Sequence, residues 1–230
     1  MGCMYKANGL YSRMSVGAVL LAAGAGSRMG TRPKALLELG GVPLVMRQLI
    51  ALSGAGVDEV AVVLGHHASQ IEEAISQFPI TVVRNPDPDA GQASSVRVGL
   101  QALSPKLDAV MVALADQPMI DAQDVTTVIS AFRRRGEKSM VVPRVCLPDG
   151  SQVPANPVMF DAALRDRWLA GGADMTCRNW RDKHPETVFW LETDNQHFSV
   201  DIDTPEDLAR FTAQTGHVLN WPQVAQTAAS

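Results

Sequence analysis

The 230-residue sequence has no surplus of basic charge. It contains 20 Lys and Arg against 24 Asp and Glu, for a formal net charge of −4 and a pI near 5.7. A general nucleic-acid surface needs clustered Lys and Arg. The longest fully apolar run, residues 109–115, is far shorter than the roughly 20 residues of a membrane-spanning helix. We therefore expect neither a nucleic-acid-binding protein nor a membrane protein.

Cysteine and histidine are sparse and irregularly spaced. The three cysteines are Cys3, Cys146 and Cys177. Their odd number and wide separation argue against zinc pairs and a disulfide framework, and suit a reducing cytoplasm. The five histidines are His66, His67, His184, His197 and His217. None of them has the spacing of a helical metal pair, and no nucleophile elbow is present, so we expect neither catalytic histidines nor a hydrolase.

The length suits one α/β domain with a full core. Apolar residues make up 46% of the sequence and the mean hydropathy is +0.01, as in a globular protein. We expect the domain to span residues 16–215. Residues 1–15 are predicted to be a disordered extension, and residues 216–230 a loose tail.

A glycine-rich stretch follows the first predicted strand. The apolar run at 18–22 leads into Gly24, Gly26 and Gly30, and a helix is expected from Leu44, just after Pro43. Glycine can take positive φ and turn its backbone N–H towards an anion. Arg28 and Lys34 add positive charge nearby. The pattern predicts a phosphate-binding loop.

Two common phosphate loops do not fit this spacing. A Walker A loop needs Gly-Lys five residues after its first glycine, but Met29 and Thr31 stand five residues after Gly24 and Gly26. The dinucleotide fingerprint is G-x-G-x-x-G with an acid about 20 residues on. Here the glycines follow G-x-G-x-x-x-G, and the second strand ends in Gly-His-His at 65–67.

Predicted strands and helices alternate along the chain. Strands are expected near 60–64, 80–83, 109–115 and 140–143, with helices at 44–52, 69–75, 96–103 and 125–132 and a hairpin or loop at 145–153. Ser69 is expected to cap the second helix, and Ser94 or Ser95 the third. The alternation predicts a Rossmann-like, single-domain, three-layer α/β/α sandwich around a mainly parallel sheet.

Carboxylates stand where predicted strands end. Asp116 follows the most apolar strand, and Asp201 and Asp203 alternate on one face of a later strand end. Ligands of open α/β sheets lie beyond the carboxyl ends of the strands, so Asp116 should share an edge with the Gly24 loop. Like charges at 201 and 203 favour a cation. We assign Mg²⁺ to Asp116 and Asp201, with Asp203 in reserve.

Five ordered motifs resemble one family. They are L-A-A-G-A-G-S-R-M-G with P-K after it, G-Q-A-S-S-V-R-V-G-L, D-Q-P, N-P-V-M-F with D-M-T-C-R further on, and D-I-D-T-P-E-D. Together they are similar to the MobA-like nucleotidyltransferases, nearest the molybdopterin cytidylyltransferases because the loop has L-A-A-G rather than L-A-G-G. The resemblance implies Mg²⁺ and these nucleotide-binding residues: Leu21, Ala22, Ala23, Gly24, Gly26, Ser27, Arg28, Lys34, Gly91, Gln92, Ser94 and Ser95.

The resemblance is weaker in the half that faces the second substrate. It implies acceptor binding by Asn156, Asp174 and Arg178. The sequence has Ala155, Ala173 and Thr176 where the family usually has glycine, and Ala93 where it often has serine. Trp168, Trp180 and Trp190 are expected to pack in the core rather than line the acceptor site.

The implied reaction is attack by an acceptor phosphate on the α-phosphorus of CTP, with loss of pyrophosphate. Arg28, Lys34 and Asp116 would be its catalytic residues. The resemblance also implies a cytoplasmic protein in transient contact with a molybdoenzyme or its chaperone. The alternatives are a guanylyl or sugar-phosphate transferase, a chaperone-like nucleotide or cofactor binder, and a nicotinamide-dependent oxidoreductase.

Overall fold

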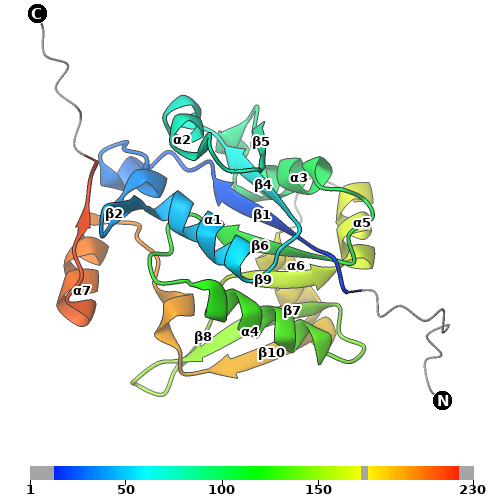
Figure 1. Ribbon diagram of the computed structural model, residues 1–230. Helices are drawn as coiled ribbons and strands as arrows, with labels where there is room; N and C mark the ends of the chain where they lie inside the picture. The colour runs from blue at the N-terminus through cyan, green and yellow to red at the C-terminus, as the bar shows by residue number, and fades with distance from the viewer. Residues whose placement is uncertain (1–12, 172–175, 223–230) are drawn as a thin grey trace, which may run out of the picture.

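The computed structural model describes residues 13–171 and 176–222. Its centre is an eight-stranded sheet with the order β10-β7-β9-β6-β1-β4-β5, in which β8 pairs with β7 (Figure 1). The strands are β1 (Val16–Ala22), β4 (Glu59–Leu64), β5 (Thr81–Arg84), β6 (Ala109–Leu114), β7 (Met140–Cys146), β8 (Gln152–Pro154), β9 (Val158–Asp161) and β10 (Val188–Thr193). All pairs are parallel except those of β9 with β6 and β7 and of β8 with β7. The expected mainly parallel sheet is confirmed.

Helices cover both faces of this sheet. They are α1 (Leu44–Gly54), α2 (Ala68–Ile75), α3 (Gln92–Ala102), α4 (Ala122–Arg133), α5 (Ala162–Ala170), α6 (Cys177–Lys183) and α7 (Pro205–Thr215). Figure 1 shows α1 and α4 in front of the sheet. Their apolar residues share cores with even-numbered β1 residues, whereas α3 packs on Val19 from the other side. The three-layer sandwich is confirmed, because successive strand side chains point to opposite faces.

Close packing of α3 on the sheet depends on one glycine. A Cβ built on Gly99 would lie 2.3 Å from Cγ1 of Val19 and 2.9 Å from Cγ2 of Val63. Any larger residue would push α3 away from β1 and β4. The helix whose N-terminus begins at Gln92 is thereby fixed beside the loop that follows β1.

Two helix starts differ from the prediction. α2 begins at Ala68 and α3 at Gln92, so neither Ser69 nor Ser94 or Ser95 caps its helix. The N-cap of α3 is Gly91, whose φ of 93° suits glycine. Ser94 and Ser95 instead bond to the side chain of Asn85. A backbone turn that only glycine adopts has replaced the serine cap.

Both ends of the domain extend further than expected. Arg13 bonds to Asp58, and Ser15 donates from its backbone and its hydroxyl to Asp108. The rest of the predicted extension lies outside the described residues. At the other end, β11 (Leu219–Asn220) pairs with β2 (Glu38–Leu39), which also pairs with β3 (Val42–Pro43). The prediction that these C-terminal residues are loose is therefore wrong for 219–220. No helix within the described ranges has the length and apolarity needed to cross a membrane.

Candidate functional site

The loop after β1 folds tightly on itself. Gly26 and Gly30 have φ of 61° and 69°, and the N–H groups of Met29 and Thr31 both donate to the Gly26 carbonyl. A Cβ on Gly26 would lie 2.1 Å from the backbone oxygen of Arg32, so only glycine fits there. Thr31 has a φ of 56°, an uncommon conformation for a β-branched residue that costs about 1–3 kcal/mol.

Lys34 joins carboxylates that are far apart in the sequence. Its Nζ donates to Asp116 Oδ2 at 2.7 Å and to Asp203 Oδ1 at 2.5 Å, and Arg28 donates to Asp203 Oδ2 at 2.8 Å. Burial alone would lower the pKa of Lys34, but the two carboxylates outweigh it and raise the pKa. Lys34 is therefore cationic. The structure brings the predicted catalytic residues Arg28, Lys34 and Asp116 into one cluster.

Two carboxyl groups at this cluster, those of Asp116 and Asp201, are not fully compensated by hydrogen bonds or by positive charge. Asp116 Oδ1 is buried and has no hydrogen-bond partner among the described residues. Partial burial, together with the negative charges of Asp116 and Asp203, raises the pKa of Asp201. Burial also opposes ionisation of Asp203, but hydrogen bonds and charge from Lys34 and Arg28 lower its pKa. An orphaned carboxylate oxygen and an unneutralised carboxylate are what a hard divalent cation satisfies, so these residues fit Mg²⁺.

The segment carrying Asp201 and Asp203 is irregular rather than the predicted strand end. Ile202, fully buried between the two acids, donates its N–H to the Asp116 carbonyl at 3.1 Å. Thr204 and Asp207 form a capping box at the start of α7. The acids reach the site because Ile202 is anchored in the core.

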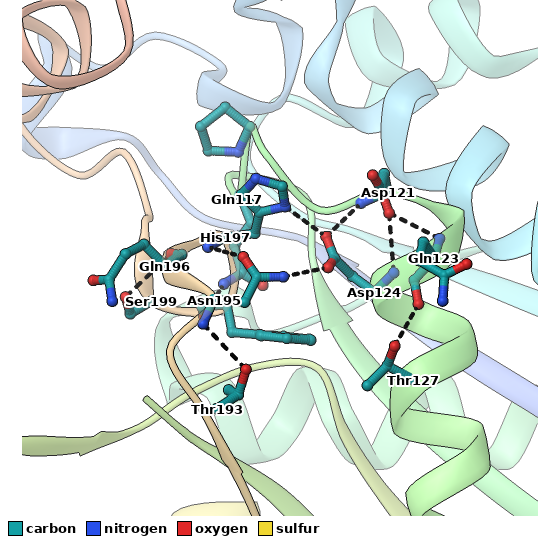
Figure 2. A network of polar contacts seen from close by, with 12 residues as sticks. Gln117, Asp121, Gln123, Asp124, Thr127, Thr193, Asn195, Gln196, His197 and Ser199 are labelled. Carbon is teal, nitrogen blue, oxygen red and sulfur yellow. Dashed lines mark hydrogen bonds and ion pairs between the residues drawn. The ribbon is translucent and has the colours of Figure 1, made fainter. Parts of the chain in front are cut away.

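A polar network fixes the chain just before this segment (Figure 2). Asp124 in the first turn of α4 accepts from Asn195 Nδ2 at 2.6 Å and from His197 Nδ1 at 2.9 Å. Gln117, next to Asp116, donates to the Phe198 carbonyl at 2.8 Å. The network links the strand end that bears Asp116 to the segment that bears Asp201.

The same network contains a group with metal-ligand chemistry. Ligand atoms of Asp121, Asp124 and His197 lie within 4.8 Å of one another. However, Asp121 already accepts from the N–H groups of Gln123 and Asp124 as the cap of α4, and Asp124 is bonded as described above. We interpret the trio as a structural network, because its hydrogen bonds already account for these side chains.

The segments expected to bind nucleotide meet at two histidines that sequence reasoning set aside. His66 Nδ1 lies 3.3 Å from the Ala23 carbonyl, and its Nε2 lies 3.1 Å from Asp89 just before Gly91. His67 Nε2 contacts the Ala25 carbonyl at 3.1 Å. Both histidines follow the end of β4, at the same sheet edge as the loop. That position in the sequence could have predicted that they lie near the nucleotide-binding segments. They connect the Gly24 loop to the start of α3.

Some predicted acceptor residues line a cavity of about 100 Å³. Gln92, Asn156 and Arg178 line it together with Arg181, which the sequence analysis did not single out, and with four valines. A second cavity of about 320 Å³ shares residues 154–156 with it and includes Asp201. Asp174 lies outside the described residues. The cavity with the predicted acceptor residues thus also includes the predicted base-binding residue Gln92, and the cavity beside it includes Asp201, the predicted metal ligand.

Two of the departures from the family's glycines, Ala155 and Thr176, have structural roles, whereas Ala173 lies outside the described residues. Thr176 accepts from the Asn179 N–H as the N-cap of α6, and Ala155 packs in the core. Cys177 lines the acceptor cavity, where burial raises the pKa of its thiol to about 12, so it stays protonated. Trp168 and Trp180 are buried, which confirms that they pack in the core.

Comparison with known proteins gives consistent relatives. The family described as the MobA-like NTP transferase domain matches residues 18–188. The nicotine blue oxidoreductase of Paenarthrobacter nicotinovorans is 32% identical over 84% of this chain and 94% of its own.

Solved structures are similar over nearly their whole length. A nucleotidyl transferase from Methanothermobacter thermautotroptrophicus has a TM-score of 0.69 and 26% identity over 87% of this chain and 97% of its own. Rv0371c from Mycobacterium tuberculosis H37Rv has a TM-score of 0.71 and 25% identity, over 88% and 100%. A manganese complex of Rv0371c shares the fold with a TM-score of 0.66 and 22% identity, over 88% and 100%.

Proposed function

This chain belongs to the MobA-like NTP transferase domain family, and on that premise we propose that it transfers CMP from CTP to a phosphorylated acceptor of the molybdopterin type. The observation that carries the proposal is the cluster of Arg28, Lys34, Asp116 and Asp203 at the end of the glycine-rich loop. Cations for a triphosphate and carboxylates for its metal stand there together.

In this reaction an oxygen of the acceptor phosphate attacks the α-phosphorus in line. The bond from that phosphorus to the bridging oxygen breaks, and its electron pair leaves with pyrophosphate. The loop glycines and residues 21–24 would hold the triphosphate through backbone N–H groups. Arg28 and Lys34 donate hydrogen bonds to Asp203 in the structure. When the nucleotide binds, they would contact its phosphates and stabilise the negative charge of the leaving pyrophosphate.

Asp116 and Asp201 would hold Mg²⁺, which supplies charge neutralisation between the phosphates. The buried, unpartnered oxygen of Asp116 and the raised pKa of Asp201 support this assignment. The manganese complex of Rv0371c is a further reason to test divalent ions on this chain.

Gln92 and Gly91 would face the base, while Asn156, Arg178 and Arg181 would receive the acceptor. The two guanidinium groups supply charge for an anionic acceptor, and the four valines in the lining favour an apolar ring face over a sugar. Asp174 remains part of the proposal by resemblance alone. We place the reaction in the cytoplasm, with transfer of the product to a molybdoenzyme or its chaperone.

The deciding experiment measures pyrophosphate release from CTP, GTP, ATP and UTP with magnesium, with and without a molybdopterin-type acceptor. Release only with CTP plus that acceptor supports the proposal. Release with GTP, or with a sugar phosphate as acceptor, replaces it by a guanylyl or sugar-phosphate transferase. Binding of NTP and magnesium without release under any pairing replaces it by a nucleotide-binding protein.

A second candidate is an oxidoreductase. The relative from Paenarthrobacter nicotinovorans, matched over 94% of its length, is named nicotine blue oxidoreductase. The loop spacing and the absence of an acid after β4 count against a nicotinamide dinucleotide site. Oxidation of reduced nicotinamide dinucleotide in the presence of nicotine blue, with no pyrophosphate release in the NTP panel, would favour this candidate.

A further inference from the structure

The C-terminal strand lies against the glycine-rich loop. β11 pairs Leu219 with Leu39 and Asn220 with Glu38, and Figure 1 shows the red end of the chain beside blue β2. The next residue, Trp221, carries the guanidinium of Arg32 3.8 Å from its ring centroid. The backbone of Arg32 packs against the start of the loop, since a Cβ on Gly26 would lie 2.1 Å from the Arg32 carbonyl oxygen.

A second anchor stands at the other end of the same turn. Met29 is buried in a small core with Leu219, Phe211 and Ile202, and Trp221 packs against that core. Thr31, with its unfavourable φ, lies between Met29 and Arg32. Such backbone conformations persist only where the surroundings hold them. Here both flanks of the turn are attached to the C-terminal element.

We propose that Trp221, together with Leu219, is a positioning residue that holds the loop in its anion-receiving conformation. Ile202 joins the same small core, so this element also sets the loop against Asp201 and Asp203. The family match ends at residue 188, and β11 lies beyond it. The proposal rests on the proposed function only for the identity of the anion, a nucleoside triphosphate.

The test compares Trp221→Ala with Trp221→Phe and with Trp190→Ala in the full chain. Trp190 is the matched control, because Arg144 stacks over its ring at 4.7 Å at the β7–β10 edge of the sheet. The first readout is the rate of tryptic cleavage after Arg28, whose side chain is 65% exposed, identified by mass spectrometry. We expect about tenfold faster cleavage in Trp221→Ala, and near-parent rates in Trp221→Phe and Trp190→Ala.

The second readout is the KM for magnesium–CTP. We expect it to rise about tenfold in Trp221→Ala, about 1.4 kcal/mol of lost binding, with a smaller change in kcat because the backbone N–H contacts of the loop are shared by ground and transition states. If Trp221→Ala is poorly folded, Arg32→Gln breaks the same pair without altering β11 and gives the same result. The double variant should then equal either single one.

The proposal would be overturned if trypsin cleaved both Trp221→Ala and Arg32→Gln after Arg28 at the rate of the parent protein, whatever their rates of pyrophosphate release. Equal acceleration in Trp190→Ala would also overturn it, as general destabilisation. Accelerated cleavage in a protein that releases no pyrophosphate with any NTP would retain the positioning role and reject the proposed function.

Discussion

Asp201 and Asp203 stand two residues apart in opposite electrostatic environments. Lys34 and Arg28 lower the pKa of Asp203, whereas partial burial and two neighbouring carboxylates raise that of Asp201. Ile202, buried between them, directs both acids to the same cluster. At the residue scale, Arg28 and Lys34 are therefore paired directly with Asp203, whereas the charge of Lys34 offsets that of Asp201 only in part.

The raised pKa of Asp201 predicts a pH-dependent response to metal. Above the ordinary carboxyl pKa of 3.8 the folded chain holds this proton more tightly than the unfolded chain, so the stabilisation from Asp201 is lost as pH rises through its raised pKa. A cation removes that penalty. We expect Mg²⁺ to raise the Tm at neutral pH, and the increase to shrink as pH falls and Asp201 is protonated.

Thermal unfolding with and without Mg²⁺ across a pH series measures this effect. Asp201→Asn should abolish the Tm increase, while the control Asp182→Asn, at an exposed acid paired with Arg181, should retain it. Asp203 contributes with the opposite sign, since its stabilisation is lost only as pH falls through its lowered pKa. A Tm increase independent of pH, or one retained in Asp201→Asn, would contradict the metal assignment.

Asp116 gives a second prediction at this scale. Asp116→Ala should lower kcat for pyrophosphate release at least about 100-fold, because it removes a proposed ligand of the Mg²⁺ that would neutralise the reacting phosphates. The backbone bond from Ile202 to the Asp116 carbonyl remains, so folding should persist by circular dichroism. Asp116→Asn keeps the shape without the charge and should lose as much activity. A folded and fully active Asp116→Ala protein would remove Asp116 from the site.

At the scale of elements, the first turn of α4 connects two chain segments. Its capping residues Asp121 and Asp124 satisfy the helix N-terminus, and Asp124 also holds Asn195 and His197 (Figure 2). His197 lies in the 3₁₀ turn Gln196–Ser199, which leads to Asp201. A helix start thus supports the segment that bears Asp201, the proposed metal ligand.

We expect Asp124→Ala to lower the free energy of unfolding by about 1–3 kcal/mol, because the partly buried donors of Asn195 and His197 lose their acceptor. It should also raise the Mg²⁺ concentration needed for half-maximal activity. The matched variant Asp121→Ala removes only a cap, costs about 1 kcal/mol, and should leave the Mg²⁺ requirement unchanged. Denaturant unfolding and Mg²⁺ titrations measure both effects. A divalent ion bound tightly by the parent and lost in His197→Ala, but not in Asp116→Ala, would instead make the trio a metal site.

At the scale of the whole molecule, one sheet supports the hydrophobic cores on both of its faces. Val19 on β1 packs towards α3, while its neighbours Ala18 and Leu20 pack towards the opposite helices. The glycine-rich loop follows this same strand, and Asp116 follows the adjacent β6. The site therefore stands on the two central strands of the domain.

Because the two cores share β1, we expect a single cooperative unfolding transition. Tryptophan fluorescence, dominated by the buried Trp168 and Trp180 of one face, should change with the same midpoint as the far-ultraviolet circular dichroism of the whole sheet. Separate midpoints would mean that the two faces unfold independently.

Local sequence determined much of this protein. The apolar strand followed by spaced glycines predicted the loop after β1, and the alternation of strands and helices predicted a mainly parallel sheet covered on both faces. The position of Asp116 at the carboxyl end of a predicted strand placed it at the same sheet edge as the loop. These features are predictable because apolar periodicity and glycine spacing depend on residues close together in the chain.

The tertiary structure decided which distant groups meet. Lys34 reaches Asp203 across 169 positions, Trp221 stacks on Arg32, and Arg181 enters the acceptor cavity. The sequence also favoured serine caps for α3, whereas Gly91 starts the helix and frees Ser94 and Ser95 for Asn85. Such contacts depend on where loops return to the sheet and on competition among many partners for each polar group, and no short stretch of residues encodes either.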